Sequence, residues 1–274
     1  MLGDIVGRVG RRAVAQMLPR LNAELAPDFV VANAENAAGG LGITRETALP
    51  IFAAGVDAMT LGNHTWAQKD TSGYFGEETR ILRPLNYPPG VPGRGWGIYP
   101  TKSGARVGVI NLIGRIFMDP VDCPFRAADH AIEQMRSRVA AIVVDMHGEA
   151  TSEKNAMGWH LDGRVAAVLG THTHIQTSDE RILPRGAGYI TDVGMVGPED
   201  SVLGQKVEAV VSKFLTGMPA RFETADGPAI FCGVSLDIDD SSGACVAIRR
   251  VQLRERKAAV DAAGPARVQS DQKG

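Results

Sequence analysis

In the stretch Val165-Ala166-Ala167-Val168-Leu169-Gly170-Thr171-His172-Thr173-His174, an apolar run passes directly into a pair of histidines. Side chains two residues apart in an extended chain point to the same side of a strand. His172 and His174 can therefore offer two imidazoles to one cavity from a single strand end. Since imidazole is a common metal ligand in proteins, this stretch predicts a buried strand that ends at a metal site.

Three other apolar runs end in polar residues of the same kind. The runs 28–32, 58–61 and 140–144 are followed by Asn33-Ala34-Glu35-Asn36, Gly62-Asn63-His64 and Asp145-Met146-His147-Gly148-Glu149, respectively. Segments with a helical spacing of apolar residues, such as 11–25, separate strands of this kind. Alternating strands and helices predict an α/β fold. In an open α/β sheet, functional groups gather at the carboxyl ends of the strands.

We therefore expect the polar residues at these strand ends to meet in one site. Its predicted members are Asp4, Glu35, Asn36, Asn63, His64, His147, His172 and His174. Oxygen and imidazole ligands without thiolate suit Mn²⁺, Fe or Zn²⁺. The set exceeds the needs of one ion, and a carboxylate such as Glu35 could bridge two. Two metals about 3.5–4 Å apart stabilise the attacking and the leaving oxygen of a displacement at phosphorus, so phosphoester hydrolysis is the predicted reaction class.

Length and composition predict one globular domain over residues 1–254. The chain has 274 residues, of which 44% are hydrophobic, which is ordinary for a soluble domain with a large core. The segments 229–238 and 244–253 predict a hairpin in a second sheet that packs on the first. The proline-rich segment 79–100 predicts a long irregular connection, and the glycines after the short first strand predict a turn. Residues 255–274 show no apolar face, and we expect them to form a flexible tail.

Charge and cysteine content exclude several classes of protein. The formal net charge of -2 provides no basic field for a stable nucleic-acid partner. The three cysteines are widely scattered, which suits neither a disulfide framework nor a zinc ribbon. The chain reaches an acid at Asp4, unlike a signal peptide, and no apolar run approaches the roughly 18 residues of a membrane span. We therefore expect a cytoplasmic protein without a membrane partner.

Five short motifs carry a family resemblance. They are Gly3-Asp4, Asn33-Ala34-Glu35-Asn36, Gly62-Asn63-His64, Asp145-Met146-His147-Gly148-Glu149 and Gly170-Thr171-His172-Thr173-His174. Together they resemble the calcineurin-like metallophosphoesterases, and more narrowly the bacterial YmdB-like branch, whose members act on 2′,3′-cyclic nucleotides. The match runs in order from Gly3 to about Val251. Most of the wider superfamily begins Gly-Asp-x-His and bridges its metals with Asp, whereas this chain has Val6 and Glu35 at those places; both departures fit the narrower branch.

The resemblance implies a four-layer αββα sandwich with two metal ions at the carboxyl ends of its strands. It implies that Asp4, Glu35, Asn36 and His174 hold one metal, and that Glu35, Asn63, His147 and His172 hold the other. A hydroxide that bridges the two metals would attack phosphorus, and His64 would protonate the leaving alkoxide. The metals would be divalent or of mixed valence, with Fe or Mn favoured and Zn possible. The resemblance also suggests a homo-oligomer that binds a small cyclic nucleotide or phosphodiester substrate.

Each predicted site residue has a simpler alternative role. The histidines could hydrogen-bond at strand ends, Asp4 and Asn63 could cap helices, Asn36 could serve a turn, and Glu35 could be a solvated carboxylate. His64 could orient phosphate without transferring a proton. The glycines at 39, 40 and 42 could approach phosphate but suit a plain loop, and Asp192 could support the histidines from behind. We assign structural roles to His130 and His160.

Two rival functions remain open at this stage. A phosphomonoesterase or nucleotidase could use the same metal site, and a more enclosed pocket with extra basic residues would favour it. A regulatory protein could bind a cyclic nucleotide with little turnover.

Overall fold

A mainly parallel sheet carries the two histidines of the opening stretch. The computed structural model describes residues 1–69 and 71–255. This sheet has the strand order β5 (Trp96–Pro100), β6 (Arg106–Ile113), β7 (Ala141–His147), β8 (Ala167–Thr171), β10 (Gly188–Ile190) and β9 (Arg181–Ile182). Strands β6, β7, β8 and β10 are parallel, and the two edge strands are antiparallel. The prediction of an α/β fold is thus confirmed.

Two smaller groups of strands lie beside each other and complete the β structure. One is parallel: β2 (Val31–Asn33), β3 (Ala58–Thr60) and β4 (Ile81–Leu82). The other has the order β1 (Asp4–Ile5), β11 (Met195–Pro198), β12 (Ala229–Ile238) and β13 (Cys245–Arg254). Leu2 bridges Ala32 on one side and Gly233 on the other, which joins the groups. The predicted hairpin is β12 and β13, which pair along their length.

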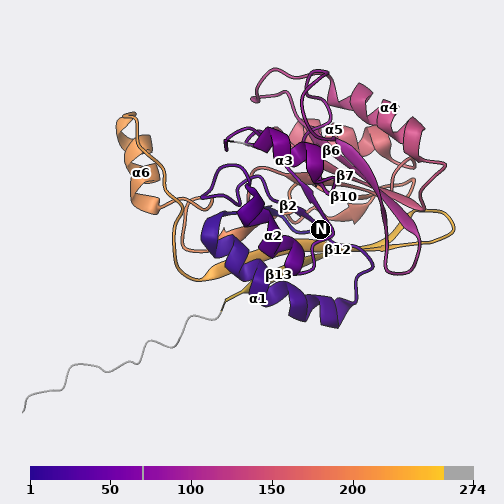
Figure 1. The fold of residues 1–274 in the computed structure, drawn as a ribbon, viewed down its shortest axis with the longest axis horizontal. Coiled ribbons are helices and arrows are strands. Elements are labelled where there is room, and N and C mark those ends of the chain that lie inside the picture. Colours follow the sequence, from indigo (N-terminus) through magenta and orange to yellow (C-terminus); the bar gives the residue numbers. More distant parts are fainter. Residues whose placement is uncertain (70, 256–274) are drawn as a thin grey trace, which may run out of the picture.

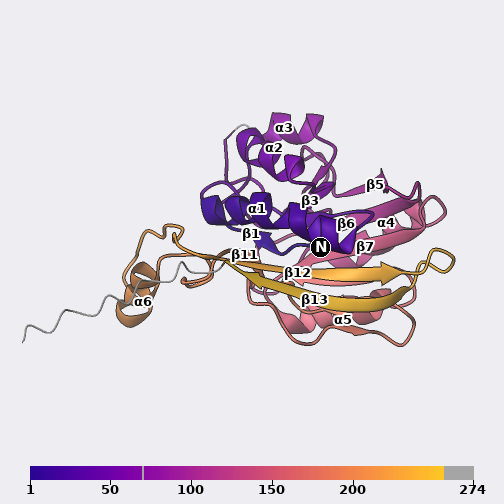
Figure 2. The same ribbon diagram turned by 90° about the horizontal axis from the view of Figure 1, so that it is seen from below.

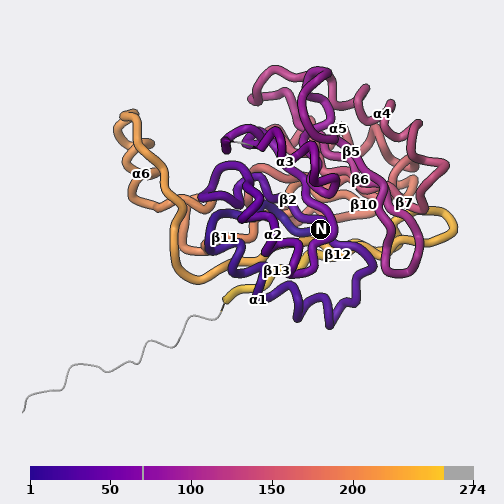
Figure 3. Tube along the Cα trace, in the orientation of Figure 1, coloured from indigo at the N-terminus to yellow at the C-terminus, as the bar shows by residue number. Residues whose placement is uncertain are grey.

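Six helices are described, and all of them except the last in the sequence cover the outer sides of these sheets (Figures 1 and 2). They are α1 (Gly7–Leu25), α2 (Arg45–Ala53), α3 (Thr71–Glu77), α4 (Pro124–Met135), α5 (Thr151–Leu161) and α6 (Val207–Thr216). Helix α1 packs against β11 and β12, whereas α4 and α5 pack against the strands β6 to β8. Helix α6 projects away from the rest of the protein at the end of a long connection, as the tube in Figure 3 also shows.

Three groups of buried apolar residues fill the spaces between these elements. One lies beneath α1 and α2 and includes Val14 and Ile51. A second lies beneath α4 and α5 and includes Ile132 and Met157. The third joins the large sheet to the smaller strand groups, with Val109 and Leu169 from the large sheet and Val31 and Leu82 from β2 and β4. Strands with apolar neighbours on both faces read as continuous apolar runs, which is why the sequence marks them so clearly.

The turn predicted around the first glycines is wrong, because α1 begins at Gly7, four residues before the predicted helix. The N–H of Gly7 donates to the carbonyl of Asn36, and Gly7 has a φ of 56°. At Gly10 an added Cβ would overlap the carbonyl oxygen of Val196 in β11. Glycine therefore serves here to bring the first helical turn close to a strand.

The prediction that segment 79–100 is entirely irregular is also wrong. It contains β4 and β5, and β5 pairs antiparallel with β6 from Trp96 to Pro100. The prolines at 84, 88, 89 and 92 lie between the two strands. Pro100 ends an edge strand, where a residue without an N–H is tolerated.

Residues 256–274 of the predicted tail lie outside the described residues. Glu255 is described, and its carboxylate forms an ion pair with Arg12 at 2.8 Å and accepts from the N–H of Ala229 at 2.9 Å. None of the helices within residues 1–69 and 71–255 combines the length and apolar character that crossing a membrane requires. The cysteines at 123, 232 and 245 form no disulfide with one another.

Candidate metal centre

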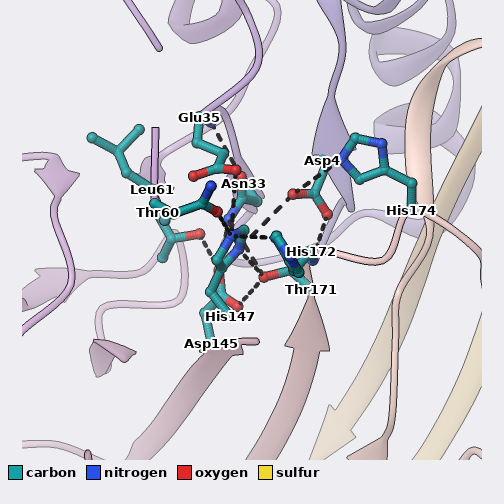
Figure 4. Close-up of polar contacts among 12 residues, drawn as sticks. Asp4, Asn33, Glu35, Thr60, Leu61, Asp145, His147, Thr171, His172 and His174 are labelled. Atoms are coloured by element: carbon teal, nitrogen blue, oxygen red, sulfur yellow. Dashed lines mark hydrogen bonds and ion pairs between the residues drawn. The ribbon is translucent and has the colours of Figure 1, made fainter. Parts of the chain in front are cut away.

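Polar bonds join the strand groups close to their carboxyl ends (Figure 4). Asn33 at the end of β2 places its Nδ2 3.3 Å from Oδ2 of Asp145 in β7. Asn111 of β6 donates to the carbonyl of Leu61, just beyond β3, at 2.8 Å. These bonds bring the segments that follow β2 and β3 over the ends of β7 and β8. Four of the five sequence motifs are carried by these strands or by the turns that follow them, and the fifth, Gly3-Asp4, lies at β1.

Three donor groups face one another at the centre of this region. Among the described residues, Glu35, His147 and His172 offer ligand atoms that all lie within 4.8 Å of one another. Nε2 of His147 lies 3.3 Å from Oε1 of Glu35 and 3.1 Å from Nδ1 of His172. Oδ1 of Asn63 lies 3.0 Å from the same Nε2. Four ligand-type side chains therefore converge on one point.

Asp4 and His174 lie on the other side of this cluster. Oδ1 of Asp4 is 3.8 Å from Nε2 of His174 and 4.0 Å from Nδ1 of His147. The backbone N–H of His172 donates to Oδ2 of Asp4 at 3.2 Å. Asp4 is fully buried, and Nδ1–H of His174 donates to the carbonyl oxygen of Leu203 at 3.0 Å. The Nε2 atom of His174 is thus the one directed at Asp4.

His64 lies between Glu35 and the solvent. Its Nδ1 is 3.0 Å from Oε1 of Glu35, and its backbone N–H donates to Oε2 at 2.9 Å. The His64 side chain is 28% exposed, whereas that of Glu35 is 1% exposed. Glu35 therefore touches both the buried cluster and a histidine that solvent can reach.

The donor set fits a cation. Oδ1 of Asp4 and Oδ1 of Asn36 are buried and have no hydrogen-bond partner within residues 1–69 and 71–255. A buried polar oxygen without a partner is costly, and a cation would satisfy both atoms. Asn36 follows Glu35 directly in the sequence. In the described part of the chain, its side chain forms no hydrogen bond with the other site residues. Hard oxygens combined with imidazoles suit Mn, Fe or Zn.

Burial and mutual charge perturb the ionisation of the cluster. Burial raises the pKa of Asp4, although the charges of His174 and His147 oppose this rise. Burial also works to raise the pKa of Glu35, but His147 and His64 hold it well below its usual range. Burial works to lower the pKa of His147, yet Glu35 and the nearby aspartates raise it to about 9. Burial and the charge of His147 lower the pKa of His172 to about 3. A cation that binds here would compete with the proton of His147.

Sequence reasoning missed the residues that orient His147. Nδ1 of His147 lies 2.9 Å from Oγ1 of Thr171, which donates to Oδ1 of Asp145 at 2.7 Å. The hydroxyl of Thr60 donates to Oδ2 of the same carboxylate. Burial raises the pKa of Asp145 to about 6. The sequence did contain a signal for Asp145. It lies two residues before His147, and residues two apart on a strand point to the same face.

The residues given structural roles lie elsewhere. His130 on α4 contacts Gln134 at 2.6 Å, and His160 on α5 contacts Asp129 at 2.9 Å. Glu149, which the sequence motif contains but to which no role was assigned, lies 3.2 Å from Nε2 of His172 and is half exposed. Both ring nitrogens of His172 therefore have polar neighbours, His147 on one side and Glu149 on the other.

Replacing Gly62 by alanine is expected to disturb this cluster. An added Cβ would overlap the His147 ring and the Glu35 carboxylate, so at least one of them must move. Displacing the groups that hold metal ligands in place typically lowers metal affinity 10- to 100-fold. We expect a loss of about that size in calorimetric titration with Mn²⁺. Gly73→Ala on α3 is the matched control, because an added Cβ there meets nothing within 4 Å. Equal affinity in the two variants would contradict this expectation.

Comparisons with known proteins show which family the chain resembles over most of its length. A family model described as "YmdB-like protein" matches residues 1–251. The chain is 44% identical over 254 residues to a 2′,3′-cyclic-nucleotide 2′-phosphodiesterase of Bacillus subtilis, covering 93% of this chain and 96% of that protein. A hypothetical protein of Thermus thermophilus is similar in structure, with a TM-score of 0.87, 43% identity and coverage of 93% and 98%. A structure titled a novel phosphatase, from Mycoplasma pneumoniae, has a TM-score of 0.87, 32% identity and coverage of 93% and 92%.

Proposed function

The chain belongs to the YmdB-like family, and from this premise we propose that it hydrolyses phosphodiester bonds of 2′,3′-cyclic nucleotides with two bound metal ions. The observation that carries the proposal is the convergence of Glu35, His147 and His172 within 4.8 Å. The name of the Bacillus subtilis relative supports the choice of substrate. The chemistry of the donor set supports the use of metals.

The proposed ligands divide into two sets that share Glu35. Asp4, Glu35, Asn36 and His174 would hold one ion, and Glu35, Asn63, His147 and His172 would hold the other. The buried oxygens of Asp4 and Asn36 that lack partners support the first set. The contacts of Asn63 and His172 with Nε2 of His147 support the second. Two such ions, when bound, neutralise the phosphate and lower the pKa of water that they coordinate.

His64 is the proposed proton donor. Its Nδ1 lies against Glu35, so Nε2 is the ring nitrogen left to face a substrate. In the reaction, water adds its oxygen to phosphorus and releases a proton to solvent, the bond from phosphorus to a ribose oxygen breaks, and His64 protonates that ribose oxygen. Cleavage at the 2′ oxygen would yield a nucleoside 3′-monophosphate. Partial exposure of His64 supports this role, because the proton must be replaced from solvent after each turnover.

The substrate class can be tested with purified protein loaded with Mn²⁺ or Fe²⁺. We expect turnover of 2′,3′-cyclic AMP to exceed that of adenosine 3′-monophosphate and adenosine 5′-monophosphate, measured as kcat/KM. A phosphomonoesterase or nucleotidase would show the reverse order. Binding of the cyclic nucleotide without product would instead identify a regulatory protein.

The proposal includes a four-layer αββα arrangement and assembly into a homo-oligomer. The three apolar clusters, one between the strand groups and two beneath helices, support the layers. On the projecting helix α6, Phe214 and Leu215 are 83% and 81% exposed, which supports contact with another copy of the chain. The free cysteines support a reducing, cytoplasmic location.

A further inference from the structure

The two histidines of the opening stretch have an unusual backbone. His172 has a φ of 101° and His174 a φ of 63°. Residues other than glycine rarely adopt positive φ, because such conformations are strained. They persist only where the surroundings hold them in place. Both strained residues are proposed ligands, and only Thr173 separates them.

Thr173 is held by the carboxylate of Asp192. Oδ2 of Asp192 accepts from the backbone N–H of Thr173 at 3.0 Å and from its hydroxyl at 2.7 Å. Oδ1 accepts from the N–H of Gly194 at 2.8 Å. Asp192 is fully buried and contacts none of the proposed ligands through its side chain. Its contacts therefore fix the middle of the strained tripeptide from behind.

Lys154 balances the charge of this carboxylate. Its Nζ donates to Oδ2 of Asp192 at 2.8 Å, and both side chains are almost wholly buried. The Cδ atom of Lys154 lies close to Gly170 in β8. A Cβ added at Gly170 would come within 2.9 Å of this Cδ atom. Burying an ion pair is costly, and hydrophobic residues of similar volume would often serve stability as well or better. We therefore look for a role of the Lys154–Asp192 ion pair other than stabilising the fold.

We propose that Lys154 and Asp192 are positioning residues for the metal centre. Their contacts fix the position of Thr173. The fixed Thr173 keeps the backbone of His172 and His174 in the strained conformation that directs their rings toward Asp4 and His147. The hydroxyl of Thr173 is the connecting group. This proposal rests on the proposed function only in that His172 and His174 bind metal.

The test compares Thr173→Val with Thr173→Ser. Valine has nearly the shape of threonine but lacks the hydroxyl that reaches Asp192, whereas serine keeps it. We expect Thr173→Val to bind Mn²⁺ about 10- to 100-fold more weakly in calorimetric titration, and Thr173→Ser to stay within about threefold of the unmodified protein. Lys154→Met is expected to weaken metal binding in the same range.

A readout on the metal-free protein separates positioning from plain stability. A positioning role predicts that adding metal raises the Tm of Thr173→Val by less than it raises the Tm of the unmodified protein. This difference is measured from the metal-free Tm of each protein, so a plain loss of stability does not affect it. Ser241→Ala is the matched control, since it removes a hydroxyl-to-carboxylate contact of 2.6 Å with Asp239 in the exposed turn between β12 and β13. It should leave metal affinity unchanged.

Two results have distinct meanings. Unchanged Mn²⁺ affinity in both Thr173→Val and Lys154→Met, with only a lower metal-free Tm, overturns the positioning role. Absence of metal binding by the unmodified protein overturns the proposed function itself. If Lys154→Met does not fold, Thr173→Val still decides the question, because it leaves the buried ion pair intact.

Discussion

Removing the metal ions is expected to lower turnover of a 2′,3′-cyclic nucleotide by about 10³-fold or more. Charge stabilisation by bound cations is worth several kcal/mol, and each ~1.4 kcal/mol of barrier is a factor of ten in rate. Without the ions, the polar groups of Glu35, His147 and His172 face one another, and no metal cation is available to stabilise charge on the phosphate. The measurement is the hydrolysis rate before and after dialysis against a chelator, with metal content determined by elemental analysis.

Readdition of single metals provides the control. Mn²⁺ or Fe²⁺ should restore the rate, and two ions per chain should be recovered at full activity. Because metal binding stabilises only the folded protein, Tm should also rise with metal concentration. Full activity in a preparation shown to contain no metal would exclude the proposed mechanism.

Replacing His64 by glutamine is expected to lower kcat for 2′,3′-cyclic AMP by about 10²- to 10⁴-fold, the usual contribution of a general acid. His64 contacts Glu35 but is not among the proposed ligands, so metal content should remain near that of the unmodified protein. The loss should shrink for a phosphodiester with a p-nitrophenyl leaving group, because this group departs without a proton. The comparison of kcat for the two substrates isolates proton transfer from phosphate binding.

His160→Gln is the matched control for this experiment. His160 lies on α5 and contacts Asp129 at the surface, so its loss should leave kcat unchanged. A His64→Gln variant with unaltered kcat for the cyclic nucleotide would remove the general-acid role. An equal loss on both substrates would instead indicate that His64 orients the phosphate.

The sequence predicted most strands and helices because their signals are local. The apolar runs that became β2, β3, β7 and β8 are almost wholly buried, and such runs are visible in the sequence. Helix α2 also has a local signal, because Thr44, directly before it, is a preferred N-cap residue, and it accepts from the N–H of Thr47 in the structure. The start of α1 and the strand β5 were not predictable in this way. The start of α1 depends on packing against β11, which lies far along the chain. Strand β5 pairs with the next strand, β6, but its Gly97 and Pro100 are typical of loops in a sequence.

The candidate ligands could likewise be named from the sequence, because chemically distinctive residues follow apolar runs in four of the five motifs. Their orientation was not. The direction of the His147 ring depends on Thr171 and Asp145, and the backbone of His172 and His174 depends on a lysine and an aspartate from α5 and the segment after β10. A strand pattern predicts which residues reach an edge of a sheet, since side-chain alternation is a property of the backbone. Only the packed tertiary structure decides where each ring nitrogen points, since that depends on hydrogen bonds between segments distant in sequence.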